Sequence, residues 1–196
     1  MLMAMRETLI AAALKVLEKR GEAQFSTRSV CALAQVKAPT LYHHFGSVDR
    51  LLSAAITEAF EQFLASKKAA SQSLDPVLVL AEGWDDYVRF AAERPRLYAA
   101  MMARVLHGAD IPAAGQAYAL LLEKIGAISS AGRLAVAKDA AAQLAWASAN
   151  AAALLYVTAS LRVAEQMHAP DPAVVAALRD RAMQLICLPV KKKKRP

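Results

Sequence analysis

The order of hydrophobic and polar positions predicts a chain made of helices. Apolar residues recur every three or four positions, as on one face of an amphipathic helix. The first such stripe contains Leu9, Ala13, Leu14 and Leu17, and Gly21 follows it as a C-cap residue. Prolines and glycines mark the later breaks. The predicted helices cover residues 5–19, 26 or 27 to 34, 38–44, 48–67, 76–93, 95–106, 112–129, 136–167 and 171–188.

Two short helices surround a tight break between residues 25 and 45. Ser26 or Thr27 can cap the first of them, and Pro39 fits only in the first turn of the second. Such a pair needs apolar residues where the helices meet and a small residue where the backbones approach. The positions that fit are Val30, Cys31, Ala34, Val36 and Leu41. This arrangement is typical of a helix-turn-helix.

The second short helix exposes a polar surface at its start and along one flank. An element of this kind can enter a major groove while hydroxyls and imidazoles reach phosphates. The residues on this surface are Lys37, Ala38, Pro39, Thr40, Tyr42, His43 and His44. Adjacent histidines do not share a helix face as metal ligands four residues apart would, so no metal site is expected.

Composition and charge agree with an all-α protein that meets a polyanion. Hydrophobic residues make up 57% of the 196 residues, with only 7 Gly and 8 Pro, and the formal net charge is +7. A positive balance favours contact with phosphates. Cys31 and Cys187 lie far apart, which excludes a disulfide framework, and Arg6 and Glu7 interrupt any signal-like core. We therefore expect a cytoplasmic protein.

An uncharged stretch at residues 140–161 is long enough to cross a bilayer. It contains several polar residues, and its apolar residues are mostly alanine, which gains little from lipid. The polar positions are Gln143, Ser148, Asn150, Thr158 and Ser160. A buried helix in a core or subunit interface explains the stretch better, although a helical membrane-associated or adaptor protein is the alternative interpretation.

The segment around the two short helices resembles the tetracycline-repressor (TetR) family. The resemblance covers about residues 6–55 and rests on Thr27-Arg28, on Ala38-Pro-Thr-Leu-Tyr-His-His-Phe45, and on Asp49-Arg-Leu-Leu52. It implies a sequence-specific transcriptional regulator that binds a double-stranded DNA operator. Thr27, Tyr42 and His43 would hold phosphates, and Arg28, Ala38, Pro39 and Thr40 would lie near base edges.

Two residues depart from the family pattern. Gln35 stands in the turn, where the family usually places glycine, and a positive φ there costs about 1 kcal/mol. Gln35 therefore implies either tolerated strain or a different turn. Lys37 replaces a capping hydroxyl with a cation, which can add a phosphate or guanine contact at some cost to the start of the helix.

The resemblance further implies a division at residues 52 and 53, with a DNA-binding domain in 1–52 and a helical ligand-binding and dimerisation domain in 53–190. The last two long helices would pair in a homodimer, through Ala145, Ala149 and Ala153 beside Leu155 and Val157, which predicts a palindromic operator. An unidentified small-molecule effector would release the operator from the repressor. The candidate pocket residues are Trp84, Tyr87, Tyr98, Met101, Met102, Tyr118, Trp146, Asn150 and Tyr156.

An enzyme would need a convergent nucleophile, acid and base, or metal set, and the sequence has no motif for one. Glu82, Asp85 and Asp86, with His107 farther on, are interpreted as a charged helix face. Neither a catalytic site nor a cofactor is expected. The basic run at residues 191–196 has nothing to bury, and we expect it to be a disordered tail.

Overall fold

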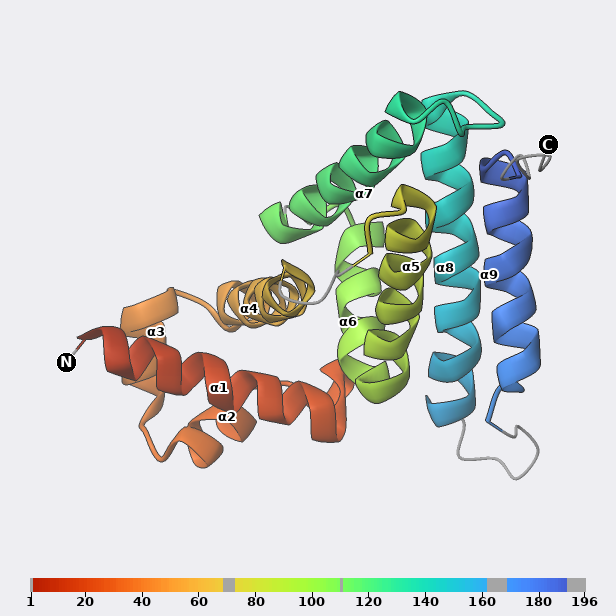
Figure 1. The fold of residues 1–196 in the computed structure, drawn as a ribbon. Helices are drawn as coiled ribbons and strands as arrows, with labels where there is room; N and C mark the ends of the chain where they lie inside the picture. The colour runs from red at the N-terminus through yellow and green to blue at the C-terminus, as the bar shows by residue number, and fades with distance from the viewer. Residues whose placement is uncertain (1, 69–72, 110, 162–168, 190–196) are drawn as a thin grey trace, which may run out of the picture. The chain divides into compact units, whose positions relative to one another are not determined.

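The computed structural model describes residues 2–68, 73–109, 111–161 and 169–189 (Figure 1). Within these ranges the chain forms nine α-helices and a short 3-10 helix and has no strand, which confirms the predicted all-α class. The helices are α1 (Leu2–Arg20), η1 (Glu22–Gln24), α2 (Thr27–Ala34), α3 (Ala38–Phe45), α4 (Val48–Lys68), α5 (Pro76–Glu93), α6 (Pro95–Leu106), α7 (Pro112–Ser130), α8 (Lys138–Leu161) and α9 (Pro172–Ile186).

Proline and capping residues set most helix starts. The helices α5 and α6 begin at prolines, as predicted, because proline is tolerated in a first turn. Asp171 caps α9 by accepting the N–H of Ala173 at 2.8 Å. Two predicted features, residues 162–167 of the eighth helix and the tail at residues 191–196, lie outside the described residues.

The chain divides into two compact units. The first contains residues 1–69 and 90–115, and the second contains residues 70–89 and 116–196, so that the division falls within α5. The first unit extends past residue 52 to include all of α4 and α6. The predicted boundary at residues 52 and 53 concerns function, and it stays a prediction.

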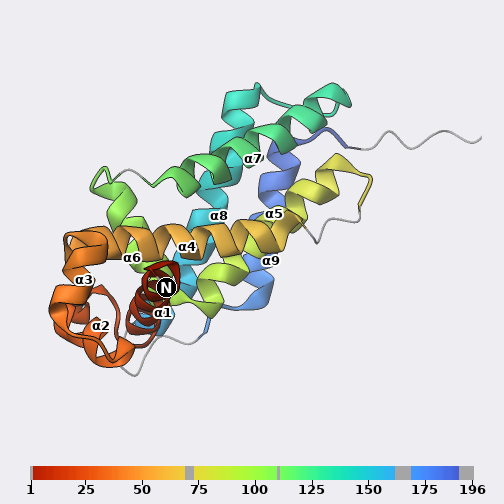
Figure 2. The same ribbon diagram turned by 90° about the vertical axis from the view of Figure 1, so that its left-hand side faces the viewer.

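The first unit has its core where α1 packs against α2, α4 and α6. Figure 2 shows α1, α2 and α3 gathered near one end of α4. Leu9 and Leu17 of α1, Leu41 of α3, and Leu51 and Ile56 of α4 are fully buried. A shared apolar core of this kind fixes the two short helices on a rigid support.

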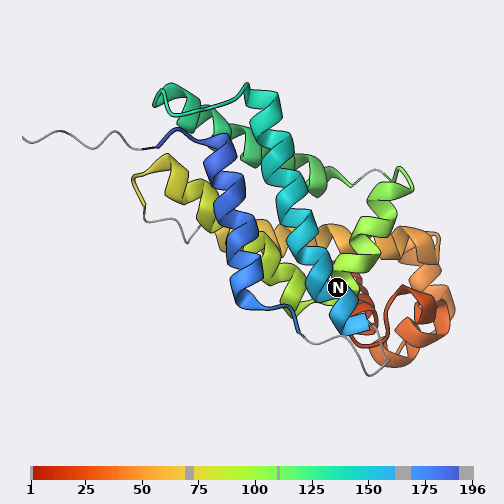
Figure 3. The same cartoon turned by 90° about the vertical axis from the view of Figure 1, so that its right-hand side faces the viewer.

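The second unit is organised around α8, which runs beside α9 (Figure 3). Two clusters of buried residues form the core of this unit. One includes Leu80, Ile125, Ile128, Ala141, Ala142, Ala145, Ile186 and Cys187, and the other includes Trp84, Val88, Ala149 and Ala152. The segment Lys138–Ser160 is long and apolar enough to cross a membrane, judged by length and composition alone. The core helix of a folded domain meets the same criterion.

The small residues predicted at a dimer interface are instead part of the chain's own core. Ala145, Ala149 and Ala153 are buried, as is Val157, and Leu155 is half-buried. The alanines let other helices of the same chain approach α8 closely. The exposed residues of α8 lie at other positions, Lys138, Asp139, Gln143, Trp146, Ala147, Ala151, Leu154 and Ser160.

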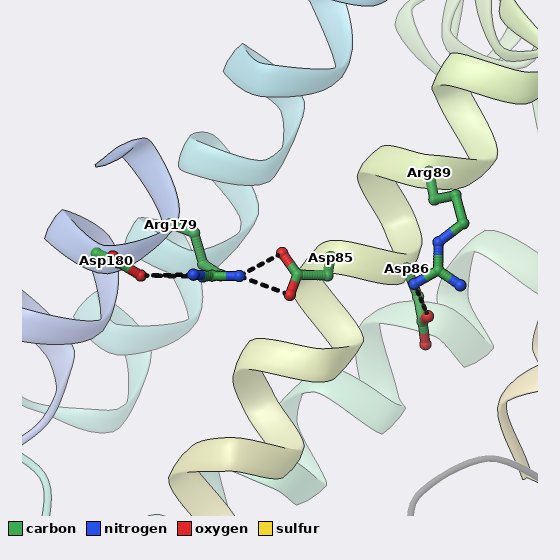
Figure 4. Close-up of polar contacts among 5 residues, drawn as sticks. All are labelled: Asp85, Asp86, Arg89, Arg179 and Asp180. Carbon is green, nitrogen blue, oxygen red and sulfur yellow. Dashed lines mark hydrogen bonds and ion pairs between the residues drawn. The ribbon is translucent and has the colours of Figure 1, made fainter. Parts of the chain in front are cut away.

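The two aspartates in the middle of α5, Asp85 and Asp86, form ion pairs (Figure 4). The Nη1 of Arg179, in α9, donates to both carboxylate oxygens of Asp85, at 2.8 and 3.1 Å. Arg179 also contacts Asp180 at 2.9 Å, and Arg89 contacts Asp86, three residues earlier, at the same distance. Asp85 therefore joins α5 to α9 within the second unit.

Candidate DNA-binding site

The first short helix, α2, is capped at both ends. Ser26 is its N-cap residue: its Oγ accepts the N–H of Ser29 at 3.1 Å, and the Oγ of Ser29 accepts the N–H of Ser26 at 3.0 Å. This capping box satisfies two backbone donors. Of the two capping residues that the sequence allows, Ser26 takes the role, which leaves Thr27 in the first turn of the helix.

The turn after α2 is made by a residue in the left-handed region. Gln35 has φ 56° and ψ 40°, and it is the only non-glycine residue with positive φ in the described ranges. Its N–H donates to the carbonyl of Cys31, as does the N–H of Val36 at 3.1 Å. The chain thus keeps the turn and tolerates the strain, the first of the two outcomes predicted for Gln35.

The residues between α2 and α3 form a small apolar contact. Val30 and Leu41 are fully buried, Cys31 and Phe45 are buried, and Val36 is half-buried. Burial raises the pKa of the Cys31 thiol, which keeps it protonated and unreactive at neutral pH. These positions support the interpretation of Cys31 as a small packing residue.

The second short helix, α3, starts without a side-chain cap. Lys37 is its N-cap residue, and only its carbonyl takes part, accepting the N–H of Thr40 at 3.0 Å. Pro39 lies in the first turn, where its missing N–H removes no helix bond. The ammonium group of Lys37 is therefore not used by the helix, and Lys37 is exposed.

The nine residues predicted to contact DNA lie at the start of α2 and along α3. Arg28, Lys37, Pro39, Tyr42 and His43 are exposed, and the others are half-buried, namely Thr27, Ala38, Thr40 and His44. The hydroxyls of Thr27 and Tyr42 lie 3.0 Å apart. Two groups predicted to hold phosphate from different helices therefore meet at one point.

Arg6, in α1, contacts the end of α3, which the sequence analysis did not predict. Its guanidinium carbon lies 5.3 Å from the centre of the Phe45 ring, at the end of α3. A guanidinium over an aromatic face is attracted by the ring. The sequence holds no local signal for this contact, since 39 positions separate Arg6 from Phe45.

The two histidines of α3 contact each other. The rings of His43 and His44 lie edge to face with centres 5.4 Å apart. Across the described ranges, no group of three or more His, Cys, Asp or Glu residues could hold a metal ion.

The structure brings together only part of the predicted ligand pocket. Trp84, Tyr87, Asn150 and Tyr156 lie near one another in the second unit. Tyr98, Met101 and Met102 belong to α6 in the first unit, where Tyr98 and Met101 are fully buried. Tyr118 and Trp146 belong to the second unit, but they are 43% and 49% exposed. The nine residues are thus divided between the two units, and the predicted pocket stays a prediction.

Three of the residues that do converge already have hydrogen-bond partners on α8. The Nε1 of Trp84 donates to the hydroxyl of Ser148 at 2.9 Å, and the hydroxyl of Tyr87 donates to the Oδ1 of Asn150 at 3.0 Å. The amide nitrogen of Asn150 donates to the carbonyl of Trp146 at 2.8 Å. We call these contacts the α5–α8 seam. They satisfy buried polar groups, as a folded core requires.

The capped α2, the tight turn and the exposed α3 define a helix-turn-helix unit. Residues 9–55 match the model of the family described as "Bacterial regulatory proteins, tetR family". The predicted resemblance to the tetracycline-repressor family is thereby confirmed. The family match and the fold support DNA-binding transcriptional regulation as the function of this chain.

Solved structures with the same fold extend this likeness to the rest of the chain. A protein of unknown function from Rhodococcus sp. RHA1 is 24% identical, with a TM-score of 0.77 over 94% of this chain and 96% of that one. A TetR-family transcriptional regulator from Haemophilus influenzae RD is 19% identical, with a TM-score of 0.64 over 95% and 98%.

A third solved structure, the multidrug binding protein EbrR complexed with imidazole, is 19% identical, with a TM-score of 0.62 over 95% of this chain and 92% of that one. At these identities the likeness concerns the fold. No protein of curated function matches the sequence.

Proposed function

We propose that this protein is a homodimeric, ligand-responsive repressor that binds a palindromic DNA operator and leaves it when a small molecule binds. The observation that carries the proposal is the surface of α2 and α3, which is exposed and polar while the opposite faces of both helices form the core. A helix-turn-helix uses such a surface to read a major groove. We expect no catalytic activity and a cytoplasmic location.

Phosphate contacts in this proposal come from Thr27, Tyr42 and His43. The hydroxyls of Thr27 and Tyr42 are hydrogen-bonded to each other at 3.0 Å, and the one that accepts in this pair keeps its own proton to donate to a phosphate oxygen. A hydroxyl contact to a phosphate carries no sequence information, and it positions the protein on any duplex. Lys37, at the start of α3, adds a cation that can bind a phosphate or a guanine.

Base contacts come from Arg28 and from the first turn of α3. The exposed side chain of Arg28 can bond guanine through two N–H groups, which is worth about 1–3 kcal/mol of discrimination. Ala38 and Pro39 offer only apolar surface, suited to a thymine methyl, and the hydroxyl of Thr40 can bond a base edge. His44, half-buried on the same helix, completes the surface.

The DNA-binding proposal is tested with a duplex that the protein selects from a random-sequence pool. Arg28→Ala should weaken binding to that duplex about tenfold or more and relax the preference at one base pair. The matched control, Arg89→Ala, removes the same charge from an exposed position on α5, which is part of neither the α2 and α3 surface nor the proposed dimer faces, and it should change neither quantity. Selection of no sequence, or equal binding to every duplex, would reject the proposal.

The dimer in this proposal forms through the exposed faces of α8 and α9. Trp146 and Leu154 on α8, and Val174 and Leu185 on α9, are large apolar residues about half exposed. Two copies related by a two-fold axis can bury them in a four-helix arrangement. The Leu154→Glu substitution should give a monomer by sedimentation at micromolar concentration. The control Leu122→Glu changes an exposed leucine of α7 and should leave the dimer intact.

The effector in this proposal binds the second unit. Support comes from the fold, which the chain shares with a multidrug binding protein solved with imidazole. Among the predicted pocket residues, the best candidate site is the α5–α8 seam, where a ligand would have to replace the hydrogen bonds of Trp84 and Tyr87. A panel of amphiphilic molecules, imidazole included, should contain members that weaken binding to the selected duplex at least tenfold. An unchanged affinity throughout would count against ligand control.

A further inference from the structure

Arg104, in the last turn of α6, is bonded to the first two turns of α4. Its Nη1 donates to one carboxylate oxygen of Asp49 at 2.5 Å, and its Nη2 donates to the other at 3.1 Å. The same Nη2 donates to the hydroxyl of Ser53 at 2.6 Å. The hydrogen bond from Arg104 lowers the pKa of Asp49, which keeps the carboxylate charged. All three residues belong to the first unit.

The start of α4 is joined to α3 by only two residues, Gly46 and Ser47. The N–H of Gly46 donates to the carbonyl of Tyr42 at 2.8 Å, and the hydroxyl of Ser47 accepts the N–H of Arg50 at 3.1 Å. Gly46 has φ 73°, a conformation that favours glycine. Because this short link is bonded to both helices, the direction of α4 sets the direction of α3.

The Arg104–Asp49 pair is poorly suited to stabilising the fold. The side chain of Asp49 is 65% exposed, and exposed ion pairs contribute little. The side chain of Arg104 is only 18% exposed, and its buried Nε has no hydrogen-bond partner among the described residues. Partial burial of a guanidinium costs free energy. What the pair does supply is geometry, since two N–H groups on two carboxylate oxygens fix an orientation.

We propose that Arg104 is a positioning residue for DNA recognition, which holds the first turn of α4, and through the Gly46-Ser47 link the recognition helix α3, in the direction that fits the major groove. The inference rests on the DNA-binding function proposed above. In this inference, Arg104 acts through Asp49 and Ser53 and makes no contact with DNA. Its loss leaves the apolar core that joins α3 to α1 and α4 intact, but the start of α4 and the α3 helix attached to it are no longer held in one direction relative to α6.

The test measures the affinity of Arg104→Gln, Asp49→Asn and the double variant for the duplex selected by the unaltered protein. A recognition helix that is correctly directed for a tenth of the time binds about tenfold more weakly. Each single variant should therefore lose about tenfold, and the double variant should lose no more than either single one. The melting temperature should change little, because the pair is largely exposed at Asp49.

Two readouts separate positioning from simple electrostatics. Asp49→Asn removes a negative charge close to the DNA-binding surface, so electrostatics alone would tighten binding, whereas positioning weakens it. Arg104→Gln should leave the slope of log affinity against log salt unchanged, because no phosphate contact is lost. The control Arg89→Gln breaks the ion pair with Asp86 on α5 and should have no effect on DNA binding.

Tighter binding by Asp49→Asn, additive losses in the double variant, or a slope that falls by about one for Arg104→Gln would each overturn the inference. These outcomes all require a selected duplex. If the unaltered protein selects no duplex, the DNA-binding proposal itself fails, and the two failures are thereby distinguished.

Discussion

The helix-turn-helix and the α5–α8 seam differ in where their polar side chains lie: exposed in the first, and hydrogen-bonded to a neighbouring helix in the second. On α2 and α3 the polar residues face outward, and Arg28, Lys37 and His43 are exposed. In the seam the polar groups of Trp84 and Tyr87 bond to partners on α8. Exposed polar groups are available to a partner molecule, whereas buried and bonded ones hold helices together. The comparison separates a surface suited to recognition from one that keeps the fold.

The first prediction tests the apolar support of the recognition surface and has the largest expected effect. Leu41→Ala should lower the free energy of unfolding by about 3 kcal/mol, because Leu41 is fully buried and leaves a cavity. Leu33→Ala is the matched control on α2, where the leucine is 48% exposed, and it should cost less than about 1 kcal/mol. Urea unfolding followed by circular dichroism measures both. Equal losses would mean that Leu41 is not part of a packed core.

The second prediction tests the seam. Ser148→Ala removes the acceptor of the Trp84 Nε1–H, and a buried donor left without an acceptor costs about 1–3 kcal/mol. Ser160→Ala, at an exposed position of the same helix, should be nearly neutral. If Ser148→Ala left the unfolding free energy unchanged, the seam would not hold α5 to α8. Its polar groups would then be free to serve an effector, and the comparison above would break.

The third prediction concerns acid, and it compares two aspartates bonded to arginines. The N–H of Val77 and the guanidinium of Arg133 lower the pKa of Asp75, and Arg104 lowers that of Asp49. A lowered pKa in the folded state gives stability that is present above the unfolded-state pKa and lost as the pH falls through the folded-state value. Asp75→Asn should therefore flatten the decline in stability below about pH 4.

The effect of Asp75→Asn should stay below about 1 kcal/mol, because the side chain is 35% exposed. Asp49→Asn should give a smaller effect, since its carboxylate is more exposed. Thermal unfolding between pH 7 and pH 3 measures both variants. A larger acid effect at Asp49 would contradict the view that its ion pair serves orientation rather than stability.

The last prediction concerns a glycine in the middle of α5. A Cβ at Gly83 would lie 3.1 Å from the ammonium nitrogen of Lys124, which donates to the carbonyl of Val79 at 3.2 Å. Burial lowers the pKa of Lys124, and nearby Glu82 opposes that shift. The Gly83→Ala substitution should stabilise the fold by about 1 kcal/mol through higher helix propensity. It should destabilise the fold by a similar amount because the new methyl group displaces the ammonium group of Lys124 from its bond with Val79.

The net change for Gly83→Ala should therefore lie near zero. The control Gly126→Ala lies on α7, where a Cβ meets nothing within 4 Å, and it should gain up to about 1 kcal/mol. Chemical unfolding of both variants makes the comparison. A full gain at Gly83 would mean that Lys124 has no fixed place against α5.

Much of the fold follows from local rules that a sequence displays. The starts of α5 and α6 are predictable because proline is compatible with a first helical turn, and both α2 and α3 follow from the residues that cap them or break the chain. The exposed surface of α2 and α3 is predictable for the same reason: it lies on two short consecutive helices, and local spacing decides which residues face outward.

The remaining features depend on residues far apart in the chain. A tyrosine or methionine at helical spacing does not reveal which helices will cover it, and so Tyr98 and Met101 could not be separated from Trp84 by sequence alone. The bond between Arg104 and Asp49 spans 55 positions. Small alanines on α8 favour close packing, but their spacing cannot tell whether the close neighbour is the same chain or a second copy.

Gln35 has a consequence for how this sequence can change. A side chain held at φ 56° costs the folded chain about 1 kcal/mol that glycine would not. A Gln35→Gly replacement should therefore raise the stability of the folded chain by a similar amount. It alters neither the exposed surface of α2 and α3 nor the core, and the added stability should let the protein tolerate a second, destabilising substitution elsewhere. A strained turn is in this sense a source of mutational robustness, available to natural variation and to protein engineering.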